Sequence, residues 1–105
     1  MNKERWAQLS FAEQLGHIGS ELSRVQQEEE SQERASRNSS LERALEMLDL
    51  TLDDQRWRSR NKELARLREA VSDWFCDQRA YNIPLKILVD YCTQFILRER
   101  MARLP

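Results

Sequence analysis

The sequence predicts an all-α protein, an antiparallel up-down four-helix bundle, and three observations support this prediction. Apolar residues recur at spacings of three and four in four separate segments, which is the period of an amphipathic helix. No segment alternates apolar and polar residues as a half-buried strand does. The 105 residues include only two glycines and two prolines, too few for a fold built from tight hairpins.

Four amphipathic helices with short connections can bury all their apolar stripes in one core. We therefore expect one domain over residues 1–105, with helices at about 11–27, 33–52, 60–77 and 84–100.

The first helix begins at a capping box, in which Ser10 is followed three residues later by Glu13. Gly16 and Gly19 lie inside this helix, and each costs about 1 kcal/mol relative to alanine. We expect them to mark a place where the backbone of another helix comes close. The stripe consists of Phe11, Leu15, Ile18, Leu22 and Val25.

The segment from Glu28 to Ser40 contains no large apolar residue. It is the best candidate for a mobile connection, with a solvated start of the second helix inside it, near Glu33. That helix should end at Asp53, because carboxylates oppose the dipole of a helix C-terminus. Its stripe consists of Leu41, Ala44, Leu45, Leu48 and Leu52.

Residues 53–59 and 79–83 form the two remaining connections, and Pro84 suits the first turn of the last helix. The third stripe consists of Leu64, Leu67, Val71, Trp74 and Phe75. The fourth consists of Leu85, Leu88, Val89, Cys92, Phe95 and Ile96.

Candidate catalytic and metal-binding groups are few. His17 is the only histidine, and Glu13 or Glu21 could orient its ring for acid–base work. A glutamate four residues from a histidine is, however, common helix-surface chemistry. A lone histidine and the absence of a C-x-x-C motif leave no metal site. We expect no enzyme, no catalytic residue, no metal and no cofactor.

The cysteines, Cys76 and Cys92, fall on the third and fourth helices. In an antiparallel pair that turns near Ala80 they would be offset by about eight residues, roughly 12 Å along the axis. That distance is too long for a disulfide. We expect free thiols that pack as small apolar groups.

The charge is unevenly distributed although the net charge is only -1. Residues 21–54 carry ten acidic and four basic side chains, whereas residues 55–68 carry six basic and one acidic. Arginine beside an aromatic ring can clamp phosphates and stack on bases. The candidate anion or nucleic-acid contacts are Arg56, Trp57, Arg58, Arg60 and Lys62.

An internal explanation competes with this one. The acidic second helix and the basic third helix would be antiparallel neighbours, so their charges could pair within the molecule. Asp49, Asp53 and Asp54 would then lie close to the arginines at 56, 58 and 60.

Eight aromatic residues exceed what four short helices can enclose, and Trp and Tyr are favoured at interfaces. Trp74 and Phe75 point about 100° apart on a helix, so one of them can face outward. We therefore expect a homodimer whose candidate contacts are Trp74, Phe75 and Tyr81. No stretch has the roughly 20 apolar residues of a membrane span, and the start lacks the apolar core of a signal peptide. We expect a cytoplasmic protein without a membrane partner.

The segments SFAEQLGHIGSELSR, LERALEMLDLTLDD and RLREAVSDWF resemble a group of small uncharacterised bacterial helical-bundle proteins, often encoded among mobile or accessory genes. In layout the chain is more distantly similar to the HEPN bundles, which bind nucleotides or cleave RNA. HEPN ribonucleases carry an arginine four to six residues before a histidine, and His17 has no arginine at that spacing. The resemblance therefore implies a fold and a setting among accessory genes, and no catalytic residue.

We expect a non-enzymatic binding or adaptor bundle that acts through protein–protein contacts. The alternative is a nucleotide- or RNA-binding bundle that uses the basic segment from Arg56 to Arg68.

Overall fold

The computed structural model describes residues 2–105, and these residues form helices and no strand. The chain is therefore all-α, as predicted. The elements are α1 (Lys3–Trp6), α2 (Phe11–Glu30), α3 (Arg34–Leu52), the 3₁₀-helix η1 (Gln55–Arg60), α4 (Asn61–Phe75) and α5 (Leu85–Ala102).

Helix α2 begins at the predicted capping box. Ser10 Oγ accepts a hydrogen bond from the Glu13 backbone at 3.1 Å, and Glu13 Oε1 accepts one from the Ser10 backbone at 2.9 Å. These bonds satisfy two of the backbone donors that a helix N-terminus leaves free. They also hold the Glu13 carboxylate ionised, so that its pKa lies below the ordinary value.

Most of the segment from Glu28 to Ser40, expected as a mobile connection, is helical, and the helix start expected near Glu33 is confirmed to within one residue. Helix α2 continues to Glu30 and α3 begins at Arg34, which leaves only residues 31–33 outside the helices. Polar contacts replace the missing apolar stripe here: Ser40 Oγ donates to Glu28 at 2.8 Å, and buried Arg37 donates to Glu29.

The other helix boundaries shift by one or two residues. Helix α4 ends at Phe75 rather than 77, and α5 continues to Ala102 rather than 100. The expected connection at 53–59 is largely helical, because η1 occupies Gln55–Arg60. The short helix α1 brings Trp6 back over the end of the bundle, where its ring is buried and Nε1 donates to Thr51 Oγ1 at 3.0 Å.

Cross-helix contacts place α3 antiparallel to α2 and α4 antiparallel to α3. Glu21 pairs with Arg43 across the first interface, and Asp49 pairs with Arg68 across the second. The core between the helices includes Leu15, Ile18, Leu22, Leu41, Leu48, Leu64, Val71, Leu85, Leu88 and Cys92.

The glycines of α2 mark the approach of α5, as the sequence predicts. A Cβ added at Gly19 would lie 3.1 Å from the Cβ of Cys92, and one added at Gly16 would lie 3.9 Å from Ile96. Residues later in α2 thus face residues earlier in α5, so these two helices are antiparallel.

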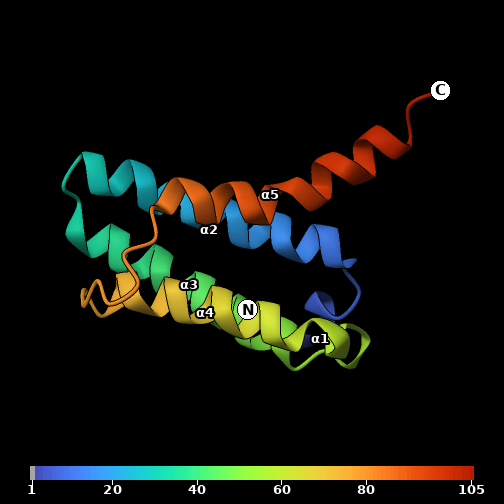
Figure 1. Ribbon diagram of the computed structural model, residues 1–105, viewed down its shortest axis with the longest axis horizontal. Coiled ribbons are helices and arrows are strands. Elements are labelled where there is room, and N and C mark those ends of the chain that lie inside the picture. The colour runs from blue at the N-terminus through green and yellow to red at the C-terminus, as the bar shows by residue number, and fades with distance from the viewer. Residues whose placement is uncertain (1) are drawn as a thin grey trace.

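Figure 1 shows α2 and α5 side by side in one layer and α3 and α4 in a second, with the last turns of α5 projecting beyond the other helices. Helices α4 and α5 hardly touch each other. The structure therefore confirms the helical class and leaves the closed four-helix up-down bundle unconfirmed, because the side between α4 and α5 is open.

Candidate functional site

A groove of about 770 Å³ lies between α4 and α5. We call it the α4–α5 groove. It is lined by Ser59, Arg60, Lys62, Glu63, Arg66, Leu67, Ala70, Ile83, Ile87, Leu88 and Tyr91. Ser59 and Arg60 belong to η1 and Ile83 to the loop before α5. The other positions recur every three or four residues, so they form one face of α4 and one face of α5.

The floor of the groove is apolar and its α4 rim is basic. Leu67, Ala70 and Leu88 lie at the bottom and are buried against the core. Ile87 stands on the α5 side with 56% of its surface exposed, so much of its apolar surface remains in contact with water. Lys62 and Arg66 are exposed on the opposite side.

Tyr91 lines the groove, but its polar atom is not accessible there. Its Oη is buried, and although the Glu63 carboxylate lies near it, no hydrogen bond of acceptable geometry forms within residues 2–105, which is costly for a hydroxyl. Burial raises the pKa of the Tyr91 phenol, and the neighbouring Glu63 carboxylate adds to this effect. The phenol is therefore neutral at every physiological pH and remains a hydrogen-bond donor.

Arg60 and two aromatic rings that meet edge-on lie at one end of the groove. The ring of Phe11 on α2 meets that of Phe95 on α5 edge-on, at 5.0 Å between centroids. The Arg60 guanidinium lies 4.5 Å from the Phe11 centroid and 5.3 Å from that of Phe95. A cation over an aromatic face is attracted by its quadrupole, so Arg60 ties the start of α4 to α5.

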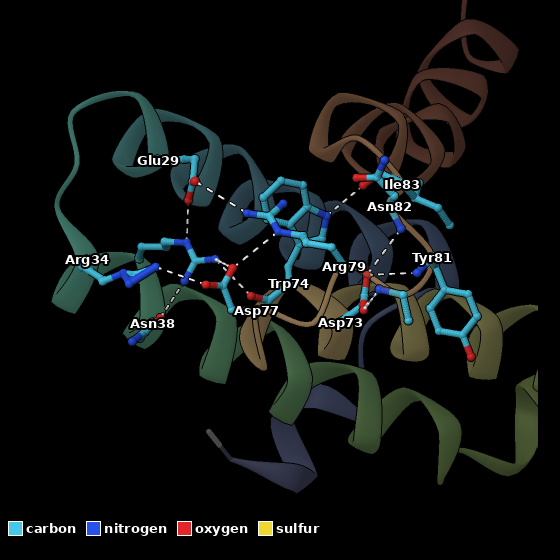
Figure 2. A network of polar contacts seen from close by, with 12 residues as sticks. Glu29, Arg34, Asn38, Asp73, Trp74, Asp77, Arg79, Tyr81, Asn82 and Ile83 are labelled. Atoms are coloured by element: carbon cyan, nitrogen blue, oxygen red, sulfur yellow. Dashed lines mark hydrogen bonds and ion pairs between the residues drawn. The ribbon is translucent and has the colours of Figure 1, made fainter.

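The loop between α4 and α5 fixes the other end. The buried Asp73 carboxylate accepts hydrogen bonds from the backbone N–H groups of Ala80, Tyr81 and Asn82, at 2.7, 3.3 and 3.4 Å. Trp74 Nε1 donates to the Ile83 carbonyl at 2.8 Å. These bonds, drawn in Figure 2, hold the loop against the end of α4 and set where α5 begins.

Arg37 anchors the same end of the molecule to α2 and α3. Its buried guanidinium donates to Glu29, to Asn38 Oδ1 at 2.8 Å and to the Trp74 carbonyl at 3.0 Å. Arg79 covers the Trp74 ring, with Cζ 3.6 Å from the centroid. Figure 2 shows these side chains converging from α2, α3 and α4 on the loop. The loop end of the groove is therefore fixed by contacts from three helices.

The predicted basic segment is divided between two places. Arg60 and Lys62 line the α4–α5 groove, whereas Arg56, Trp57 and Arg58 lie outside it. Arg56 donates to Asp54 at 2.7 Å and to the Leu9 carbonyl at 2.9 Å. The half-buried Trp57 donates from Nε1 to Gln14 at 2.9 Å, while Arg58 is exposed.

The expected pairing between the acidic and the basic helix occurs, partly with other partners. Asp54 pairs with Arg56, as anticipated. Asp49 pairs with Arg68 instead, and Asp53 pairs with Lys3 at 3.2 Å. Many of the unevenly distributed charges are thus paired with each other within the molecule.

The candidate self-association residues lie near the loop end. Trp74 and Phe75 are half-buried, and the Trp74 ring is covered by Arg79. Tyr81 is 57% exposed, and its hydroxyl donates to Glu69 at 3.1 Å. Of the three, Tyr81 presents the most accessible surface.

The structure also shows the contacts of His17 and the exposure of the two cysteines. The exposed His17 ring lies 5.8 Å from that of Trp6, while Glu13 binds Ser10 and Glu21 binds Arg43. Both cysteines are free, as predicted. The expectation that both pack as apolar groups is wrong for Cys76, which is exposed because α4 ends there and α5 does not cover it.

Sequence reasoning missed the groove residues of α5. Ile87 and Tyr91 lie outside the stripe expected for that helix. One signal for them is present in the sequence: α5 has apolar side chains on more of its circumference than one packed face requires.

No family model, curated protein or solved structure matches the chain. None of the helices within residues 2–105 is both long enough and apolar enough to cross a bilayer. Within the same residues, no three His, Cys, Asp or Glu side chains are grouped so as to hold a metal ion.

Proposed function

We propose that the chain is a non-enzymatic binding module that holds part of a partner protein in the α4–α5 groove. The observation that supports this is the open apolar floor between two helices whose ends are both fixed. A groove with apolar walls and a few polar groups is the usual form of a recognition site. In this proposal the fold is an up-down four-helix bundle whose fourth interface is completed by the partner.

Two exposed residues of α5 provide a matched test. Ile87 lies in the groove with 56% of its surface exposed, and Leu97 lies outside it with 55% exposed. Neither is in the buried core, so replacing either by glutamate should change the free energy of unfolding by less than about 0.5 kcal/mol.

The measurement is affinity capture from a lysate of the source organism, quantified by mass spectrometry. We expect at least one protein to be captured by the wild type and by Leu97→Glu, and lost with Ile87→Glu. A set of captured proteins that is the same for all three baits would reject the groove as the binding site.

Self-association through Trp74, Phe75 and Tyr81 stays a prediction. Sedimentation at micromolar concentration tests it directly, since a molar mass near 12.6 kDa would exclude the homodimer. The RNA-binding alternative also stays a prediction, with Arg58→Glu and the salt dependence of binding as its test.

A further inference from the structure

Two basic side chains on the rim of the α4–α5 groove are not paired with carboxylates of the described part of the chain. Arg60 forms an ion pair with Glu63, at 3.0 Å between nitrogen and oxygen, and its guanidinium lies over the rings of Phe11 and Phe95. Lys62 and Arg66 form no ion pair within residues 2–105 and are exposed. They differ in this from Arg56 and Arg68, whose side chains are held by carboxylates. Two uncommitted cations therefore border one long side of an apolar floor.

The groove is about as long as a short helix. On α4 its lining extends from Lys62 to Ala70, a rise of about 12 Å or a little over two helical turns, and Ser59 and Arg60 of η1 extend it further. A docked helix would meet it with apolar residues at positions i, i+4 and i+7. The aliphatic residues Leu67, Ile87 and Leu88 offer such side chains a contact surface. Tyr91 is the one aromatic residue in the lining, and a single ring offers little surface on which successive bases could stack.

A second copy of this chain does not supply the complementary helix. Apart from Tyr81 in the loop, the large exposed apolar residues outside the groove within residues 2–105 are Leu97 and Met101 on the projecting end of α5 and Leu104 just after it. They are interleaved with Arg98, Arg100 and Arg103. Docking that end into the groove of another copy would place these arginines beside Lys62 and Arg66, and like charges at an interface repel.

We propose that the α4–α5 groove binds an acidic amphipathic helix of a partner protein. The apolar face of that helix packs on Leu67, Ala70, Ile87 and Leu88, and its flanking Asp or Glu side chains meet Lys62 and Arg66. This inference rests on the proposed function and adds the chemistry of the partner.

Selection from a displayed library of randomised helical peptides of about 14 residues tests the inference. The immobilised wild type is the target, and Ile87→Glu is used for counter-selection. We expect the enriched peptides to carry apolar residues at spacings of three and four, with an excess of Asp and Glu beside them.

The enriched peptides are then titrated against charge-reversal variants by fluorescence anisotropy. The double variant Lys62→Glu, Arg66→Glu should bind them about five- to tenfold more weakly than the wild type, with the loss largest at low salt. The control Arg98→Glu, Arg100→Glu reverses two exposed arginines outside the groove and should leave the affinity unchanged. Circular dichroism confirms that all variants are folded.

Four outcomes overturn the inference. Groove-dependent peptides without acidic flanks, or with an affinity that Lys62→Glu, Arg66→Glu leaves unchanged, reject an acidic helix and leave the proposed function standing. Failure to enrich any peptide on the wild type over Ile87→Glu rejects both. Displacement of the enriched peptides by a single-stranded RNA oligonucleotide assigns the rim to nucleic acid instead.

Discussion

Gly19 of α2 and Cys92 of α5 lie so close together that a Cβ at position 19 would come within 3.1 Å of the Cys92 Cβ, and equally close to Thr93 Cγ2. Three residues earlier, a Cβ at Gly16 would meet Ile96 at an ordinary 3.9 Å. The two glycines of the chain thus serve different purposes, although they share one helix. Only Gly19 is required by the packing of α5 on α2.

Alanine at these two positions should therefore have opposite effects. Gly16→Ala should stabilise the protein by up to about 1 kcal/mol through helix propensity. Gly19→Ala should destabilise it by about 1–2 kcal/mol, because Cys92 is buried and its Cβ cannot turn away. Urea unfolding of both variants checks this, and equal midpoints would contradict the close packing at Gly19.

Replacing Arg37 should lower the free energy of unfolding by more than replacing an exposed polar residue does. Arg37→Met removes one of two donors from the Trp74 carbonyl, which keeps the Asp77 N–H at 3.3 Å, and leaves the Glu29 carboxylate with only the longer ion pair to Arg79 at 3.8 Å. We expect a loss of about 1–2 kcal/mol in the free energy of unfolding. The matched control is Arg34→Met, which removes an exposed ion pair to Asp77 at 3.3 Å and should cost less than about 0.5 kcal/mol. Thermal unfolding of the two variants measures both losses. Similar losses of stability would mean that the buried contacts of Arg37 contribute no more than the exposed ion pair of Arg34.

Replacing Gln32 by glycine should raise the free energy of unfolding. It follows the last turn of α2 with φ at 60°, while the Glu33 N–H bonds to the Glu28 carbonyl at 2.9 Å, which is the Schellman arrangement. Glycine adopts this left-handed conformation without penalty, so Gln32→Gly should stabilise the protein by about 1 kcal/mol. Ser31→Gly is the control, since its φ of -87° favours no glycine. A gain at position 31 as large as at 32 would point away from the left-handed conformation as the cause.

The sequence predicts the helices well because their signals are local. The capping box at Ser10 and the apolar spacing of α2 each lie within a few turns of chain, and both appear in the structure. The spacing predicts that the first helix ends at about residue 27, whereas α2 continues to Glu30, because Ser40 and Arg37 of α3 bind Glu28 and Glu29 in its last turns. Such a polar network depends on contacts between helices, which periodicity does not contain.

The groove could not be predicted for a similar reason. Its width depends on where α5 starts, and that is set by Asp73 accepting three backbone hydrogen bonds from the loop. No sequence motif at Asp73 or in the loop predicts these hydrogen bonds. The sequence did indicate Arg60 and Lys62, because an excess of basic residues is visible in composition alone.

The two cysteines should differ sharply in reactivity. Burial raises the pKa of the Cys92 thiol to about 12, and the reactive species of cysteine is the thiolate. Cys76 is exposed. A disulfide-exchange reagent at neutral pH should therefore titrate one thiol in the native protein and two in urea, and Cys76→Ser should abolish the fast reaction. Two fast thiols in the native protein would show that α5 opens from α2 readily.

The stability of the protein should fall in acid partly through Asp54. The Arg56 side chain donates to this carboxylate and lowers its pKa below the ordinary value, with smaller contributions from the Arg56 backbone and Gln14. A carboxylate with a lower pKa in the folded state contributes stability above its unfolded pKa of about 3.9, and the contribution is lost as the pH falls through the folded pKa. Asp54→Asn should therefore be less stable than the wild type at pH 6, with the gap narrowing toward pH 2. Urea midpoints across this range measure it, and a gap that stays constant would mean that ionisation of Asp54 does not contribute.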